Sequence, residues 1–114
     1  DGGRWQGTEV VPEDWVRQSV APSAPPVSNP NDVFGYGYQW WVPVDADGEF
    51  YAVGIYGQYI YVNPKARIVV VQTAADRNFR ADGHDGHIVK QETIAMFRAI
   101  AEHYGDWRLP GGNN

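Results

Sequence analysis

The sequence predicts an α+β fold: a three-stranded antiparallel meander with a long C-terminal helix packed on one face and a short N-terminal helix. Three observations carry this prediction. Segments rich in aromatic and β-branched residues follow one another with short turns between them. An apolar stripe at helical spacing then runs through residues 87–104. The 13 Gly and 8 Pro among 114 residues indicate many turns, which favours this class over a helical bundle.

Length and composition bound the possible functions. A chain of 114 residues forms one domain at most and can bury roughly 65% of its unfolded surface. The net charge of -5, without a basic patch, argues against a nucleic-acid partner. The absence of cysteine excludes disulfides and thiolate zinc sites and leaves the compartment open. No apolar run approaches the ~20 residues of a membrane span, so no membrane partner is expected.

Residues 1–33 are expected to hold a short helix followed by a proline-rich loop. The helix is placed over 12–19, because proline suits the first helical position. Glu13 and Asp14 then lie in the first turn, where they complement the helix dipole. Residues 21–31 contain four prolines and no periodicity, which indicates a surface loop; a proline-rich ligand for another domain is the alternative.

Residues 34–74 are expected to form the meander. Its strands are placed over 35–42, 50–63 and 67–73, with Asp47-Gly48 at the tip of the first turn. Gly54, Gly57 and Gln58 interrupt the second strand in its middle, and a clean alternation of apolar and aromatic residues finishes it. The third strand is an unbroken apolar run, which is typical of a central strand buried on both faces.

The C-terminal part is expected to contain a loop over 75–86, a helix over 87–104 and a tail over 105–114, frayed from Asp106 onward. Gly105 ends the helix as a C-cap residue would. The apolar stripe of the helix consists of Val89, Met96, Phe97, Ile100 and Tyr104.

This helix is expected to cover the sheet face that carries Ile60, Val62 and Val70. Tyr59 and Tyr61 then lie on the second face, which only the short N-terminal helix remains to cover. A central strand such as the third one also requires a wider sheet than three strands supply. Residues 1–114 are therefore interpreted as a single partial domain of a larger protein.

Three segments carry a resemblance to a known family. "GYGYQWW" at 35–41 and "FYAVGIYGQYIYVNPKARIVVVQTA" at 50–74, followed by a terminal amphipathic helix, resemble the C-terminal end of serine hydrolases of the β-lactamase/penicillin-binding-protein superfamily. The branch they resemble is that of class C-like esterases and 6-aminohexanoate-dimer hydrolases. "DGGRWQGTEVVPEDWVRQSVAP" at 1–22 is similar to the segment before these strands. The resemblance implies a part of a larger β-lactamase-like α/β sandwich.

In that superfamily the nucleophile is the serine of a Ser-x-x-Lys motif, assisted by the tyrosine of a Tyr-x-Asn motif. Neither motif is found here: no serine has a lysine three residues on, and Tyr61-Val62-Asn63 is interpreted as a chance match at a strand end. Gly54-Ile55-Tyr56 stands in the region of the family's Lys-Thr-Gly motif, which argues against true β-lactam hydrolysis. The chain alone is therefore expected to be inactive.

The resemblance implies a role for the strand that contains Gly54-x-x-Gly57-Gln58. Acyl transfer needs donors aimed at the developing oxyanion, and a backbone N–H on a strand can serve. The catalytic group implied is the backbone N–H of Ile55. The two glycines would let a substrate approach the backbone closely; the alternative is that they form a β-bulge at a sheet edge. For Trp41, the alternative to lining the pocket is packing in the core. The implied substrate-binding residues are Trp41, Gly54, Tyr56, Gly57 and Gln58.

The loop before the last helix contains His84, Asp85 and His87. Such residues can bind a metal, but spacing fixes no third ligand, so neither a metal nor a cofactor is predicted. The favoured interpretation is a solvated loop in which Asp85 lies at the helix N-terminus. The rim of a substrate pocket is the third interpretation.

Three hypotheses of function follow. The chain is a C-terminal fragment of a serine hydrolase that acts on small-molecule esters, amides or lactams. Alternatively, it is a stand-alone interaction module that uses its aromatic surface, or one half of a split enzyme. The expected partner is the missing N-terminal part of the same domain, or a second copy of the chain through self-association.

Overall fold

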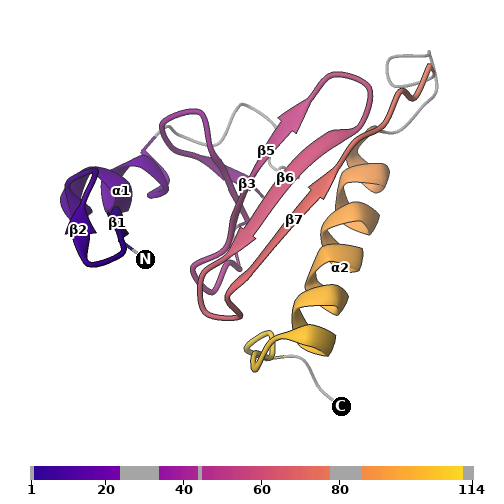
Figure 1. Cartoon of the computed structure of the whole chain (residues 1–114). Coiled ribbons are helices and arrows are strands. Elements are labelled where there is room, and N and C mark those ends of the chain that lie inside the picture. Colours follow the sequence, from indigo (N-terminus) through magenta and orange to yellow (C-terminus); the bar gives the residue numbers. More distant parts are fainter. Residues whose placement is uncertain (1, 24–33, 44, 78–85, 112–114) are drawn as a thin grey trace. The chain divides into compact units, whose positions relative to one another are not determined.

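The computed structural model describes residues 2–23, 34–43, 45–77 and 86–111 of the chain (Figure 1). These residues form two compact units, Asp1–Ala52 and Val53–Asn114, each of which is described by itself. The elements in chain order are β1 (Arg4–Trp5), β2 (Thr8–Glu9), α1 (Glu13–Ser19), β3 (Phe34–Tyr36), β4 (Trp41–Pro43), β5 (Phe50–Gly54), β6 (Gln58–Asn63), β7 (Ile68–Gln72) and α2 (Gly86–Tyr104).

The main sheet is antiparallel with five strands in the order β3-β4-β5-β6-β7, so the expected class is correct and the expected number of strands is wrong. Two of the expected strands are each divided by a turn. The first breaks where the Gly37 N–H donates to the Trp40 carbonyl at 2.8 Å and Gln39 adopts a φ of 65°. The second breaks at Tyr56 and Gly57, whose φ values are 71° and 83°. Left-handed residues reverse the chain. Tyrosine and glutamine seldom adopt a positive φ, so the sequence did not indicate a turn at either place.

The first unit contains a small hairpin, β1–β2, and the helix α1. Gln6 and Gly7 form the hairpin turn with φ values of 48° and 80°. Helix α1 begins one residue later than expected, because Pro12 is its N-cap, and none of its residues is buried. The end of α1 meets the turn after β3: the Tyr38 N–H donates to the Ser19 carbonyl at 2.9 Å. A Cβ at Gly37 would lie 2.4 Å from the same oxygen, so only glycine fits there.

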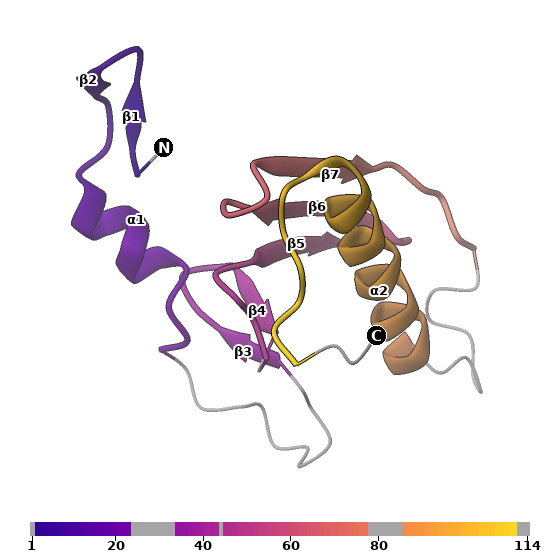
Figure 2. The ribbon, with the colours of Figure 1, turned by 90° about the horizontal axis from the view of Figure 1, so that it is seen from below.

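In the second unit α2 covers one face of β6 and β7 (Figure 2). The expected face was wrong for Ile60 and Val62, whereas Val70, which pairs with Tyr61, lies on the helix side as expected. Tyr59 and Tyr61 are buried, and both rings contact Phe97 of α2, with centroids 5.7 and 5.4 Å apart. The opposite face carries Ile60, which is exposed, paired with Val71 across the strands. Both faces of β6 are apolar, so the alternation alone could not decide which one meets the helix.

The buried stripe of α2 is also shifted from the expected one. Ile94, Phe97 and Ala101 are at most 4% exposed, whereas Met96 and Tyr104 are 46% and 75% exposed. Both stripes satisfy the helical period and share Phe97. The small side chain of Ala101 allows the helix to approach the sheet closely, which a count of large apolar residues overlooks.

The segment after α2 is described through residue 111 and makes contacts with the helix, so the expectation of a frayed tail is wrong for this part. Trp107 is buried, and the Leu109 N–H donates to Glu102 Oε1 at 3.2 Å. Gly105 follows the helix without a left-handed φ. Its requirement is space, because a Cβ there would lie 2.7 Å from the Ala66 carbonyl oxygen.

The predicted turn after β6 is confirmed and is held by a side chain. Asn63 is fully buried, and its Oδ1 accepts the Ala66 N–H at 2.9 Å while its Nδ2 donates to the Tyr61 hydroxyl at 3.2 Å. An asparagine before proline is well suited to this capping of a turn. The turn joins β6 to β7, and the Ala66 carbonyl oxygen within it is an atom that leaves no room for a Cβ at Gly105.

Candidate functional site

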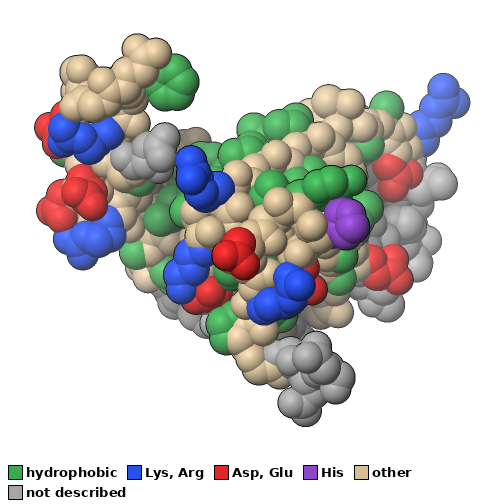
Figure 3. Space-filling view, turned by 60° about the horizontal axis from the view of Figure 1, so that its bottom comes forward, with side chains coloured by type: hydrophobic (Ala, Val, Ile, Leu, Met, Phe, Trp, Pro, Cys, Tyr) green, Lys and Arg blue, Asp and Glu red, His purple; other side chains and the backbone are tan. Residues whose placement is uncertain are grey.

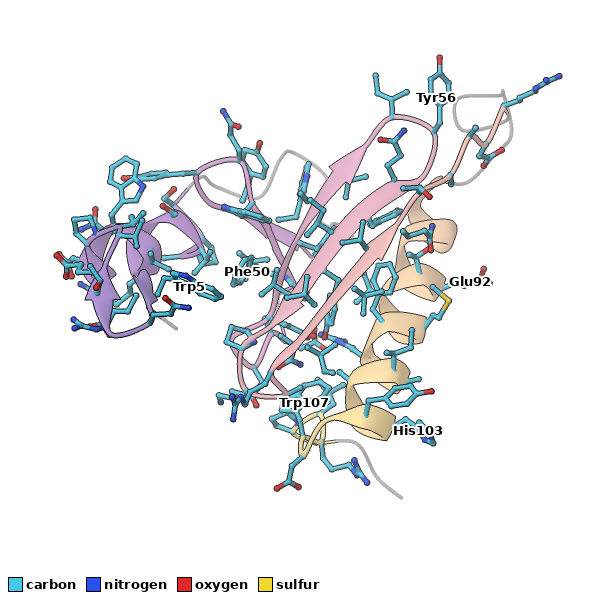
Figure 4. The ribbon with its side chains drawn as sticks, in the orientation of Figure 1. Trp5, Phe50, Tyr56, Glu92, His103 and Trp107 are labelled. Atoms are coloured by element: carbon cyan, nitrogen blue, oxygen red, sulfur yellow. The ribbon has the colours of Figure 1, made fainter. Side chains whose placement is uncertain are left out.

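The five residues Gly54–Gln58, which the sequence singled out, lie together at the tip between β5 and β6. Gly54 ends β5 and Gln58 begins β6, so the three residues between them make the turn. Ile55 and Tyr56 are 51% and 52% exposed. Figure 4 shows the Tyr56 side chain directed outward from the tip. The chain therefore offers backbone and side-chain groups to a ligand at this end of the hairpin.

The two glycines of the tip have different requirements. Gly57 has a φ of 83°, which L-residues rarely adopt, while the nearest atom to a Cβ there would be 3.6 Å away. At Gly54 the φ is ordinary, but a Cβ would lie 3.1 Å from the Gln58 Cβ. Gly57 thus serves the conformation of the turn, and Gly54 serves the close approach of a neighbouring side chain.

Two hydrogen bonds tie the tip to the chain at and beyond the end of β7. The Gly57 carbonyl accepts a hydrogen bond from Gln72 Nε2 at 3.0 Å, and the Tyr56 carbonyl accepts one from the Asp76 N–H at 3.1 Å. Sequence reasoning predicted neither contact. No local pattern could have indicated them, because the contact depends on the register that pairs Tyr59 with Gln72.

Trp41 lies on β4 in the first unit, half-buried, with its ring centroid 4.7 Å from that of Tyr36. Its backbone pairs with Tyr51 of β5. The neighbouring Trp40 contacts Phe50 instead, at 5.0 Å in an edge-to-face arrangement. The two adjacent tryptophans thus have different ring partners.

Electrostatic perturbations among the described residues are few. Burial raises the pKa of the Tyr59 phenol, and a hydrogen bond with Thr93 opposes this shift. Tyr59 therefore stays protonated at neutral pH and serves the core rather than acid–base chemistry. At the surface, the hydrogen bond from Arg17 and the charge of that residue lower the pKa of Asp14.

Figure 3 shows that Lys and Arg side chains alternate with Asp and Glu side chains on the face drawn, without a continuous patch of either sign.

The loop before α2 was interpreted as a metal site, as a solvated loop or as the rim of a substrate pocket. His84 and Asp85 lie outside the described residues, as does the side chain of His87. Within the described part of the chain, no group of three His, Asp or Glu side chains is placed to hold a metal ion. In the same part, no helix is long and apolar enough to cross a membrane.

Comparison with known proteins adds one similarity. No protein-family model matches the chain. A solved structure titled "Putative 6-aminohexanoate-dimer hydrolase from Bacillus anthracis" is similar, with a TM-score of 0.64 and 26% sequence identity over 90% of this chain. The match spans 25% of that protein's length. The α+β architecture with its five-stranded sheet is thus similar to about a quarter of a hydrolase, which fits a C-terminal fragment of that hydrolase family.

Proposed function

We propose that the chain is the C-terminal segment of a serine hydrolase of the β-lactamase superfamily, in the class C-like esterase or 6-aminohexanoate-dimer hydrolase branch. The observation that carries the proposal is the similarity to a hydrolase structure over 90% of the chain. Because the match spans 25% of that protein, the activity is assigned to the parent enzyme. The parent cleaves an ester, an amide or a lactam through an acyl-enzyme and requires no cofactor.

Within this proposal the β5–β6 tip is one wall of the active site. The serine and lysine that form the acyl-enzyme come from residues outside this sequence. As the serine attacks the carbonyl carbon, negative charge develops on the carbonyl oxygen, and the Ile55 N–H donates to it. Gly54 and Gly57 allow the substrate to approach the backbone, and the exposed Tyr56 contacts it. Gln58 is a further substrate-binding residue of the tip. Trp41, in the first unit, is proposed as a substrate-binding residue on the resemblance alone.

The uncovered face of β6 and β7 supports a larger domain. Ile60, Val69 and Val71 are 42%, 63% and 64% exposed, although they form one regular row of aliphatic side chains across two paired strands. Such rows are normally covered, and β7 is also the last strand in the sheet order. We propose that the N-terminal part of the same domain covers this face, and that the isolated chain self-associates through it.

The oxyanion role is tested by removing one N–H from the full-length enzyme. Replacing the amide before Ile55 with an ester, by semisynthesis, deletes the N–H and keeps the side chain. We expect kcat for a nitrophenyl ester to fall about 10²–10³-fold. The matched control replaces the amide before Tyr56, which perturbs the same turn, and should change kcat only a few-fold. Equal losses in the two variants would show that Ile55 is not the donor.

The fragment hypothesis has its own test. The full-length protein should hydrolyse nitrophenyl esters or small amides, whereas the 114-residue chain alone should not. Sedimentation should show association of the isolated chain, and a hydrophobic dye should bind it. Turnover after mixing the chain with the separately produced upstream segment would support the split-enzyme version. A full-length protein without any ester or amide hydrolysis would contradict the proposed function.

A second candidate function rests on the aromatic surface of the first unit. Trp15 and Tyr38 are 56% and 46% exposed, and their rings lie 5.4 Å apart. Trp5 is 66% exposed. Exposed aromatic residues are typical anchors of protein interfaces. If the chain is an interaction module, the double variant Trp15→Ala/Tyr38→Ala should lose partner binding while the full-length protein keeps its rate of ester hydrolysis.

A further inference from the structure

The tip between β5 and β6 adopts a conformation that its own sequence does not favour. Tyr56 and Gly57, two of the three residues between β5 and β6, have φ values of 71° and 83°, so two consecutive residues of the turn are left-handed. Asparagine followed by glycine is the preferred pair in such turns, and the left-handed conformation is unfavourable for a tyrosine because its Cβ approaches the following carbonyl oxygen. A residue is held in this region only where its surroundings determine it more strongly than its own preference.

The contacts that hold Tyr56 and Gly57 in this conformation come from the end of β7 and the segment after it. The Gln72 side-chain amide donates to the Gly57 carbonyl at 3.0 Å, across 15 positions of sequence. The Asp76 N–H donates to the Tyr56 carbonyl at 3.1 Å. The ladder of paired residues between β6 and β7 ends at Tyr59 and Gln72, so these two bonds continue it around the tip.

These bonds also fix where the backbone donors of the tip point. All described peptide bonds are trans, and in a planar trans peptide the C=O and the following N–H point in opposite directions. The Tyr56 carbonyl is directed toward the Asp76 N–H and the Gly57 carbonyl toward the Gln72 side chain, so the N–H groups of Gly57 and Gln58, which follow these carbonyls, are directed away from those partners. On the other side of the turn, the Gln58 side chain fills the space that a side chain at Gly54 would need. The backbone from Gly54 to Gln58 is therefore held from both ends.

We propose that Gln72 is a positioning residue: through its hydrogen bond to the Gly57 carbonyl, it holds the β5–β6 tip, and with it the Ile55 N–H, in the geometry that acyl transfer requires. This inference rests on the proposed function. Gln72 touches no reacting atom and acts on the backbone of the turn. Without its amide donor, the half-buried Gly57 carbonyl loses its partner and the turn relaxes toward conformations that tyrosine prefers.

The test uses two near-isosteric variants of Gln72 in the full-length enzyme, with a nitrophenyl ester as substrate. Gln72→Met keeps the length of the side chain and removes the donor. Gln72→Glu keeps the shape; its ionised carboxylate cannot donate, but the protonated acid can. We expect kcat to fall about tenfold to a hundredfold in both variants at neutral pH, because misplacement of about 1 Å in a catalytic group can cost a factor of that order. KM should change less than kcat.

The pH profile separates positioning from simple loss of stability. The kcat of Gln72→Glu, relative to wild type, should recover as the pH falls toward the ordinary glutamic-acid pKa of about 4.3, while Gln72→Met stays low at every pH. Thr73→Val, an exposed site on the next residue, is the matched control and should keep wild-type kcat. Hydrogen exchange of the Asp76 amide should quicken in Gln72→Met without a matching change in the denaturant midpoint.

The outcomes distinguish a failure of the proposed function from a failure of the positioning role of Gln72. A wild-type enzyme that hydrolyses no ester would remove the proposed function, and the positioning role with it. An active wild type whose kcat is unchanged in Gln72→Met would overturn the positioning role alone. Losses in Gln72→Glu that do not recover at acid pH would also overturn it.

Discussion

Phe97 provides the sharpest test of how α2 meets the sheet. Its side chain is fully buried, and its ring lies 5.4 Å from that of Tyr61, nearly stacked at 29°, and 5.7 Å from that of Tyr59. Replacing a buried phenylalanine with alanine lowers the free energy of unfolding by about 3–5 kcal/mol. The two lost ring contacts are part of this sum, at about 0.5–1.5 kcal/mol each. We expect Phe97→Ala to reach the upper half of the range.

Met96 is the matched control, because it is the neighbouring residue and belongs to the stripe expected from the sequence. It is 46% exposed, so Met96→Ala should cost less than about 1 kcal/mol. Urea unfolding of the chain, followed by circular dichroism, gives both values by linear extrapolation. If Phe97→Ala does not fold, Phe97→Leu, with a smaller loss, keeps the comparison possible. Equal losses at the two positions would refute the assignment of the buried face of α2.

Three further predictions concern the rest of the described chain. Gly37→Ala should lower the free energy of unfolding by about 1–3 kcal/mol, because its Cβ would lie 2.4 Å from the Ser19 carbonyl oxygen; a loss below that of Gly7→Ala, a site with a left-handed φ but open space, would contradict this reason. Burial raises the pKa of Tyr59 in the folded state, so above about pH 10 the unfolded chain releases this proton first and stability falls as the pH rises. Stability curves of wild type and Tyr59→Phe that stay parallel between pH 9 and 11 would disprove that contribution. Glu102→Ala should cost about 0.5–1.5 kcal/mol and expose the Leu109 amide to hydrogen exchange, whereas Glu102→Gln, which keeps an acceptor, should protect it.

Much of the candidate site could be predicted because it is short and local. The five residues Gly54–Gln58 are contiguous in sequence, so any fold with a strand here would bring them together. The role of Ile55 came from a resemblance and stays a prediction, as does that of Trp41. The contacts of Gln72 and Asp76 with the tip could not be predicted, because they depend on the register of the strands. They also depend on a turn whose sequence lacks the Asn-Gly or Asp-Gly pair that usually indicates one.

The sequence by itself determined the features that depend on local patterns. Periodicity located α2, which the structure begins at Gly86 and ends at Tyr104, within one residue of the expected bounds. The apolar run located β7, and Asn63-Pro64 located the turn before it. The α+β class followed from these elements, because periodicity and turn residues act over only a few positions of the chain.

Only the tertiary structure decided the features that depend on distant partners. The tyrosine face of β6, rather than the aliphatic face, meets α2, because the aromatic rings of Tyr59 and Tyr61 pack against the ring of Phe97. The left-handed Tyr56 divides one expected strand into β5 and β6. Backbone hydrogen bonds and ring packing between residues far apart in sequence outweigh weak local preferences, and those contacts exist only once the register is formed.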